Sequence, residues 1–247
     1  MRYKCTVSYD GTNFHGFQIQ DNLRTVQEEI EGVLKIITKK ETRIYPAGRT
    51  DTGVHGIGQV FHFDTEIVMK EWNMQNAINS RLPRDVYITK VERVGDNFHS
   101  RFSKHIKEYH YIIDLNEYNP LLGNYRYFYK HKLDIEKMIE ASKVFVGEHD
   151  FASFTKNHKI ENTVRTIYSI DFDIKDKVIT IKFIGNGFLH NMIRIIVAMM
   201  IEVGNNRLEI ERLKEIMESK NRKLAPKTAP ANGLYLYNIV YEDTNFK

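Results

Sequence analysis

Ten residues between two short apolar runs combine glycines with ionisable side chains. The segment from Ala47 to Gly56 holds three glycines together with Arg49, Asp51 and His55. Glycine permits a positive φ and a close approach of the backbone, and an arginine two residues from a carboxylate can keep it ionised or bind a phosphate. The alternative is an Asx turn, in which Asp51 bonds its own backbone and Arg49 is solvated. An acid beside a base on a glycine-shaped turn is typical of an active site.

An arginine inside an apolar run is a second candidate. Arg194 stands within residues 192–201, which are otherwise apolar. An unpaired guanidinium buried there would be very costly, so we expect a buried acidic partner, and Asp51 is the natural candidate. Tyr109 and Tyr111 alternate onto one face of a strand-like run. Ordinary cross-strand packing is enough to account for these two tyrosines taken alone.

The elements that would position the loop follow from hydrophobic periodicity. Thr25 and Glu28 form a capping-box pattern in front of a segment with apolar residues at helical spacing. The first half is predicted to contain strands at 2–9, 43–46, 59–63 and 86–94 and helices at 25–39 and 71–80. The order of elements is therefore βαββαβ.

The second half carries the same mixture of elements. A strand-like run extends from Phe98 to Ile113, and a hairpin turns at Lys175-Asp176. Helices are predicted at 134–145, at 188–203, and from a cap at Asn206 and Glu209 to about 219, before a closing strand at 234–241. Two successive α+β halves suggest one extended, mostly antiparallel sheet with the helices on one face and the other face open to a large partner.

Composition excludes several classes of protein. The chain has 247 residues, of which 42% are hydrophobic and 28% charged, as in an ordinary globular protein. Its most apolar stretch, 193–203, is shorter than the ~20 residues of a membrane-spanning helix. The single cysteine, Cys5, excludes an internal disulfide and a cysteine-cluster zinc site. A net charge of +4 leans toward a polyanionic partner, and the N-terminus lacks a signal-peptide pattern, so we expect a cytoplasmic protein with no membrane partner.

Six segments carry a resemblance to a known family. Residues 47–56 resemble the Gly-Arg-Thr-Asp-x-Gly-Val-His signature of the tRNA pseudouridine synthase A family. The other matching segments follow in family order: 9–20, 98–103 with Tyr109 and Tyr111, 147–151 with Phe154, 187–194, and 228–236. Together they cover nearly the whole chain. The match departs at Phe17, where the family usually has tryptophan, at Gly56, where it usually has alanine, and at 107–111, where it is usually richer in arginine.

The resemblance implies a fold and a reaction. The fold would be that of pseudouridine synthases: two ferredoxin-like or RRM-like α+β halves, 1–105 with the catalytic loop 47–56 and 106–247, forming one catalytic body. The reaction would isomerise uridine to pseudouridine in the anticodon arm of tRNA, usually at position 38, 39 or 40. No metal, nucleotide or redox cofactor is needed, and family members act as homodimers.

The resemblance also implies a role for individual residues. Asp51 would be the nucleophile, acting at the ribose C1′ or on the pyrimidine ring, and Arg194 would pair with it. Tyr109 would stack on the flipped base and act as acid or base, while Leu189 would line the base pocket. Arg49 would insert where the target base was stacked. His55 is expected to be structural or to contact RNA, and Arg101 and Lys107 are further candidates for contact with RNA.

Three other functions remain open at this point. A diverged copy of the enzyme would modify another RNA. A protein that kept the fold and lost the chemistry would only bind RNA. An N-glycosidase or nucleotide hydrolase would release free uracil, and it would normally use a second carboxylate, which the loop around Asp51 does not supply.

Overall fold

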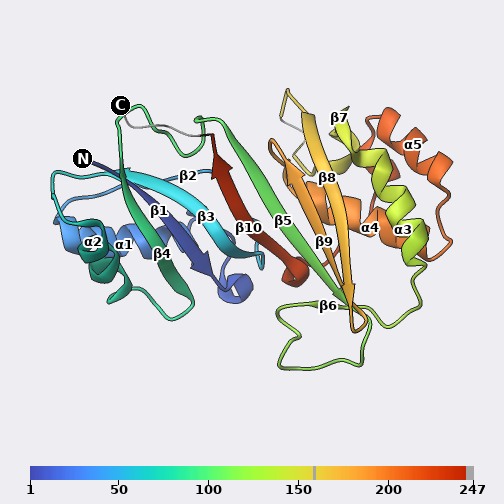
Figure 1. Cartoon of the computed structure of the whole chain (residues 1–247), viewed down its shortest axis with the longest axis horizontal. Coiled ribbons are helices and arrows are strands. Elements are labelled where there is room, and N and C mark those ends of the chain that lie inside the picture. The colour runs from blue at the N-terminus through green and yellow to red at the C-terminus, as the bar shows by residue number, and fades with distance from the viewer. Residues whose placement is uncertain (158–159, 243–247) are drawn as a thin grey trace. The chain divides into compact units, whose positions relative to one another are not determined.

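The computed structural model describes residues 1–157 and 160–242. The chain divides into two compact units (Figure 1). One comprises Met1–His105 together with the closing segment that begins at Tyr235, and the other comprises Ile106–Leu234. The sequence pattern predicts that every residue after 105 belongs to the second half, whereas the closing strand belongs to the first unit and pairs with β3 there. A strand that returns from the far end of the chain carries no local signal of the sheet it will join.

The first unit contains the βαββαβ order expected from periodicity. Its elements are β1 (Arg2–Tyr9), α1 (Val26–Thr38), β2 (Tyr45–Pro46), β3 (His55–Asp64), α2 (Glu71–Asn79), β4 (Val86–Val94) and the closing β10 (Leu234–Tyr241). The strand order is β4-β1-β3, with both pairings antiparallel. The other edge of β3 is shared, because β2 pairs antiparallel with its second half and β10 runs parallel to its start, where Tyr235 faces His55.

Both helices of this unit cover the same face of its strands. Every second residue of β1 is buried, and those side chains form one core with residues of α1, α2, β3 and β4. The cap predicted for α1 is confirmed, because the Thr25 hydroxyl accepts a hydrogen bond from the Glu28 N–H. Fully burying an aliphatic side chain such as Ile30 or Leu34 contributes about 1.5–3 kcal/mol. This burial fixes β1 and β3, and hence the ends of the loop between β2 and β3.

The second unit holds a second antiparallel arrangement. Its elements are β5 (His105–Asp114), β6 (Tyr127–Phe128), α3 (Ile135–Ser142), β7 (Gly147–Asp150), β8 (Val164–Lys175), β9 (Val178–Gly185), α4 (Met192–Gly204) and α5 (Ile210–Glu218), with short 3-10 turns at 143–145, 152–154, 222–224 and 231–233. The strand order is β5-β9-β8-β7, and β6 lies parallel to β5. The predicted hairpin of β8 and β9 is confirmed, and the class of fold is α+β as expected.

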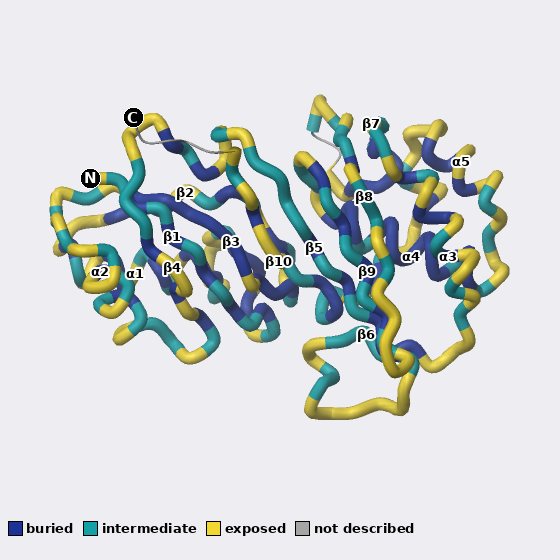
Figure 2. The backbone as a smooth tube through the Cα atoms, viewed as in Figure 1, coloured by how far each residue is buried: buried dark blue, intermediate teal, exposed yellow. Residues whose placement is uncertain are grey.

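Helix α4 is the centre of this unit. All its residues except Arg194 and Glu202 are buried, so it is dark along nearly its whole length (Figure 2). This burial explains why the most apolar stretch of the sequence is a core helix. In the part of the chain that the structure describes, no helix is long and apolar enough to cross a membrane.

Three predicted boundaries are wrong for local reasons. The strand expected from Phe98 begins only at His105, because 98–103 form a turn in which the Ser103 N–H bonds the His99 carbonyl and the Ser103 hydroxyl accepts from the His99 N–H. Helix α4 begins at Met192 rather than 188, since Asn191 adopts a left-handed φ of 63°. Asn206 is also left-handed and does not cap α5, whose N-cap is Glu209.

Candidate active site

The loop that carries Asp51 is fastened on both sides of that residue. On one side, Thr50 is buried, and its hydroxyl lies 2.8 Å from the Tyr9 hydroxyl. On the other side, the Val54 N–H donates to the Asp51 carbonyl at 3.1 Å. The side chain of Asp51 is half-buried and that of Arg49 is exposed. The backbone around the carboxylate is therefore held, while both ionisable side chains reach the surface of the unit.

Two glycines outside the loop make this arrangement possible. A Cβ on Gly16, whose φ is +89°, would lie 2.7 Å from the Thr50 carbonyl oxygen. A Cβ on Gly11 would lie 2.1 Å from the Val54 carbonyl oxygen. The segment after β1 thus packs directly against the loop, and no larger residue fits at either position. Two separate sequence motifs, 9–20 and 47–56, form one local structure.

His55 is buried at the end of the loop. Its Nδ1 accepts a hydrogen bond from the Gly11 N–H at 3.1 Å, and its ring stacks on Tyr235 with centroids 4.7 Å apart. The Asp10 carboxylate lies 3.3 Å from the same nitrogen. Only 2% of His55 is exposed, which favours a role in positioning the loop over direct contact with RNA.

The start of α4 gathers three candidates of the second unit. Tyr109 on β5 is buried and meets the ring of Phe188 edge to face at 5.2 Å. Leu189, in the connection to α4, is buried as well, and its N–H lies 3.4 Å from the Met192 sulfur. Arg194 lies in the first turn of the helix. Tyr109 therefore belongs to β5, Leu189 to the segment that joins β9 to α4, and Arg194 to α4 itself.

Arg194 is held by the chain near the C-terminus. Its Nε–H donates to the Ala229 carbonyl at 2.7 Å, and the Ala229 N–H donates to the Arg194 carbonyl at 2.9 Å. The apolar run predicts that Arg194 is buried, but its side chain is only half-buried, in a turn of α4 whose other residues are buried. The Nε–H bond fixes the plane of the guanidinium, which has further donors at its end.

Tyr111 has a structural role that separates it from Tyr109. Its hydroxyl donates to the Pro230 carbonyl at 2.8 Å, and the side chain is fully buried. Burial raises the pKa of Tyr111 well above its ordinary value, although the charge of Arg194 lowers it in part. Tyr111 is therefore a neutral hydrogen-bond donor that holds the segment around Ala229. Lys107, two residues before Tyr109 on β5, is half-buried.

An exposed aromatic residue beside Arg101 is a candidate that the sequence analysis missed. Phe102 is 75% exposed, its ring centroid lies 4.4 Å from that of His99, and the Arg101 guanidinium lies 5.7 Å from it. An arginine and an exposed ring side by side are typical of surfaces on which nucleic-acid bases stack. The serines on either side of Arg101 and Phe102 favour a turn over a strand, and this is the signal in the sequence that places Phe102 on a loop.

The candidates fall into two groups. Arg49, Asp51, His55 and Arg101 belong to the first unit, and Lys107, Tyr109, Leu189 and Arg194 belong to the second. Nowhere in residues 1–157 and 160–242 do three or more His, Cys, Asp or Glu side chains gather as a metal site would require. The first group supplies a carboxylate on an anchored loop, and the second supplies an aromatic ring, an apolar wall and a guanidinium.

Comparison with known proteins identifies the class of protein. The chain belongs to the tRNA pseudouridine synthase family, whose model matches residues 6–103 and 141–242. It is 45% identical to tRNA pseudouridine synthase A of Streptococcus agalactiae, over 98% of this chain and 96% of that protein. It is 44% identical to the protein of the same name from Geobacillus sp. and to tRNA pseudouridine synthase A 1 of Bacillus cereus, each over 98% of this chain and 99% of the relative.

These matches confirm the predicted family and the predicted class of enzyme, an isomerase that acts on uridine in tRNA. Asp51 lies in the first matched stretch, and Leu189 and Arg194 lie in the second. Residues 104–140 lie outside both stretches. Lys107 and Tyr109 fall in that interval.

Proposed function

We propose that this chain converts uridine to pseudouridine in the anticodon arm of tRNA, at position 38, 39 or 40, with Asp51 as the nucleophile. The observation that carries the proposal is the half-buried carboxylate in a loop whose backbone is anchored on both sides. Such anchoring supports nucleophilic catalysis because the reacting group keeps its position as the substrate changes. The family membership and the names of the relatives support the choice of tRNA.

The reaction is an isomerisation, so it consumes nothing. The bond from the ribose C1′ to N1 of uracil breaks, a bond from C1′ to C5 forms, the proton on C5 is lost and N1 gains a proton. The Asp51 carboxylate attacks either C1′ or the pyrimidine ring, and it leaves again when the new bond forms. The detached base must turn before it is rejoined, so the pocket must exclude water and retain the base.

The other candidates serve this step. Tyr109 stacks on the flipped base and acts as acid or base, Leu189 forms an apolar wall, and Arg194 pairs with the Asp51 carboxylate. A paired arginine favours the ionised form of a carboxylate, which is the form that attacks. The Arg194 Nε–H bond to Ala229 supports this role, since it directs the rest of the guanidinium.

Surface residues serve the RNA. Arg49 is exposed and takes the place of the flipped base in the stack, at a cost of a few kcal/mol for unstacking that contacts to the extruded nucleotide offset. Arg101 and Lys107 meet phosphates, which position the RNA without reading its sequence. His55 acts through the loop. By family resemblance, we also propose a homodimer that works in the cytoplasm.

The test is to map pseudouridine in defined transcripts. Purified protein is incubated in EDTA, without nucleotide, with a tRNA that carries uridine at 38, 39 and 40, and with a control that carries cytidine there. Pseudouridine at one or more of these positions, and none in the control, is the expected result. Pseudouridine only in other cellular RNA would contradict the proposed target, release of free uracil would indicate a hydrolase, and RNA binding without either product would indicate a protein that only binds.

A further inference from the structure

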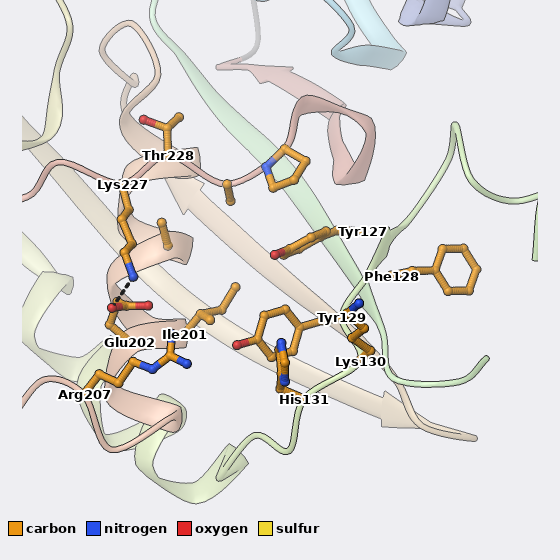
Figure 3. Close-up of a pocket in the computed structure, with 13 residues that line it drawn as sticks. Tyr127, Phe128, Tyr129, Lys130, His131, Ile201, Glu202, Arg207, Lys227 and Thr228 are labelled. Atoms are coloured by element: carbon orange, nitrogen blue, oxygen red, sulfur yellow. Dashed lines mark hydrogen bonds and ion pairs between the residues drawn. The ribbon is translucent and has the colours of Figure 1, made fainter. Parts of the chain in front are cut away.

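A cavity of about 560 Å³ lies in the second unit. It is bordered by the segment 127–131, by the later turns of α4 and by the segment 227–230 (Figure 3). None of Tyr109, Leu189 and Arg194 lines it. Its volume lies within the 300–1,000 Å³ range of small-molecule sites and is sufficient for one nucleotide.

One wall of the cavity is aromatic. Tyr127 and Tyr129 point into it, while Phe128 points away (Figure 3). The two tyrosine rings meet edge to face at 5.6 Å, and the Tyr129 hydroxyl accepts a hydrogen bond from the Asn205 amide. Tyr127 is half-buried, so part of its ring remains available. A partly exposed ring that is held by a second ring is a surface on which a planar base stacks.

Basic side chains complete the lining, with Arg207 across the cavity from the tyrosines and His131 on the tyrosines' own segment. Arg207 extends toward the cavity from beyond the end of α4, and His131 lies beside Tyr129 (Figure 3). Glu202 is the one acidic lining residue, and it is paired with Lys227 at 2.5 Å. Among the described residues, no salt bridge involves Arg207. A guanidinium that no carboxylate neutralises is suited to a phosphate, which it binds with two parallel hydrogen bonds.

We infer that this cavity binds a nucleoside phosphate, with the phosphate on Arg207 and His131 and the base against Tyr127. A simple inorganic anion would make no contact with the tyrosine rings, and a purely apolar ligand would make no use of the charge of Arg207. The ligand is either a free nucleotide or one nucleotide of an RNA chain. The segment 127–131 lies outside the stretches that the family model matches.

Occupation of the cavity bears on the position of Arg194. Ala229 and Pro230 line the cavity, and their carbonyl groups accept the bonds from Arg194 and Tyr111. A ligand packed against this segment braces the acceptor that orients the guanidinium. A bound nucleotide would therefore stabilise the orientation of Arg194, a residue of the proposed reaction.

The test measures binding by calorimetry to the full-length protein, with uridine 5′-monophosphate, adenosine 5′-monophosphate, uridine and inorganic phosphate as separate probes. A labelled anticodon stem-loop RNA supplies the second arm. The variants are Arg207→Gln and His131→Gln, both at exposed positions, and the matched control is Lys175→Gln, an exposed lysine at the end of β8 outside the cavity. Thermal melting checks that each variant is folded.

We expect each cavity variant to raise the dissociation constant of the ligand at least about tenfold, as loss of a charge-assisted hydrogen bond does. Lys175→Gln should change that constant less than twofold. If the monophosphates show this loss, the ligand is a free nucleotide, and if only the stem-loop shows it, the ligand is part of an RNA. Binding of inorganic phosphate as tight as that of the monophosphates would overturn the inference, as would equal affinities for all probes in the variants and the control. Asp51→Asn should leave this binding unchanged, so failure here is distinct from failure of the proposed reaction.

Discussion

The two units hold their candidate residues by different physical means. In the first unit, a short loop is tied by hydrogen bonds to the segment after β1, and Asp51 stays at its surface. In the second unit, Arg194 lies at the start of a helix that is buried on nearly all sides. A network of hydrogen bonds positions a group while leaving it accessible, whereas a buried helix holds a group rigidly at its end. Substitutions in the first unit should therefore displace the Asp51 loop, whereas substitution of Arg194 in the second unit should remove the positive charge at the start of α4.

Apart from loss of the Asp51 carboxylate itself, the largest effect on activity should come from Arg194. Replacing Arg194 by Gln should lower kcat by about 10²–10³-fold, because one preorganised charged donor is lost. Arg194→Lys should recover little, since lysine lacks both the planar fork and the Nε–H that bonds Ala229. Single-turnover pseudouridine formation measures both variants, with Arg212→Gln on the exposed face of α5 as the control. Wild-type kcat in Arg194→Lys would show that any positive charge is sufficient.

Gly16→Ala should disrupt the packing of the Asp51 loop and have the second largest effect. The added Cβ would lie 2.7 Å from the Thr50 carbonyl at a φ of +89°, so we expect a loss of about 1–3 kcal/mol in the free energy of unfolding. Displacement of the loop should also lower kcat by tenfold or more, as small misplacements of reacting groups do. The matched control is Gly32→Ala in α1, where a Cβ meets nothing within 4 Å. That control should be stabilised by about 0.5–1 kcal/mol, and equal behaviour of the two variants would contradict the packing described.

The stability of the first unit should depend on pH through His62. Burial, with smaller contributions from Arg2 and His99, lowers the pKa of His62 from 6.5 to about 4. Because the folded state binds this proton less readily than the unfolded state, the stabilisation is complete above pH 6.5 and is lost as pH falls toward 4. Urea unfolding at pH 7.5 and 4.5 should show a loss of about 2 kcal/mol more in wild type than in His62→Gln. Identical losses would mean that His62 titrates normally.

The smallest effect should come from the exposed ring that the sequence analysis missed. Phe102→Ala should leave the melting temperature unchanged and weaken RNA binding by about five- to tenfold, the effect of losing one stacking contact. Trp72→Ala removes another exposed aromatic residue, on α2, and should change RNA affinity less than twofold. Fluorescence anisotropy with a tRNA transcript measures both. An equal loss in the two variants would mean that Phe102 has no specific contact.

Local patterns predicted the elements whose ends are determined by their own residues. Alternation placed β1 and β4, and the Thr25 cap placed the start of α1. The turn at 98–103 and the late start of α4 depend on left-handed residues and on side-chain bonds that the apolar pattern does not show. The candidate site divides in the same way. Asp51 follows from its loop, whereas the burial of His55 depends on Tyr235, 180 positions away in the chain, and was not foreseen.

The most direct test of the central claim separates chemistry from binding at Asp51. Asp51→Asn keeps the size and shape of the side chain and removes the nucleophilic charge. Single-turnover pseudouridine formation and tRNA affinity are measured on the same preparation, with Asp171→Asn on β8 as the control. We predict a loss of about 10⁴-fold or more in rate, with tRNA affinity within twofold of wild type. A variant that still forms pseudouridine, or one that loses tRNA binding in proportion to its activity, would contradict the role assigned to Asp51.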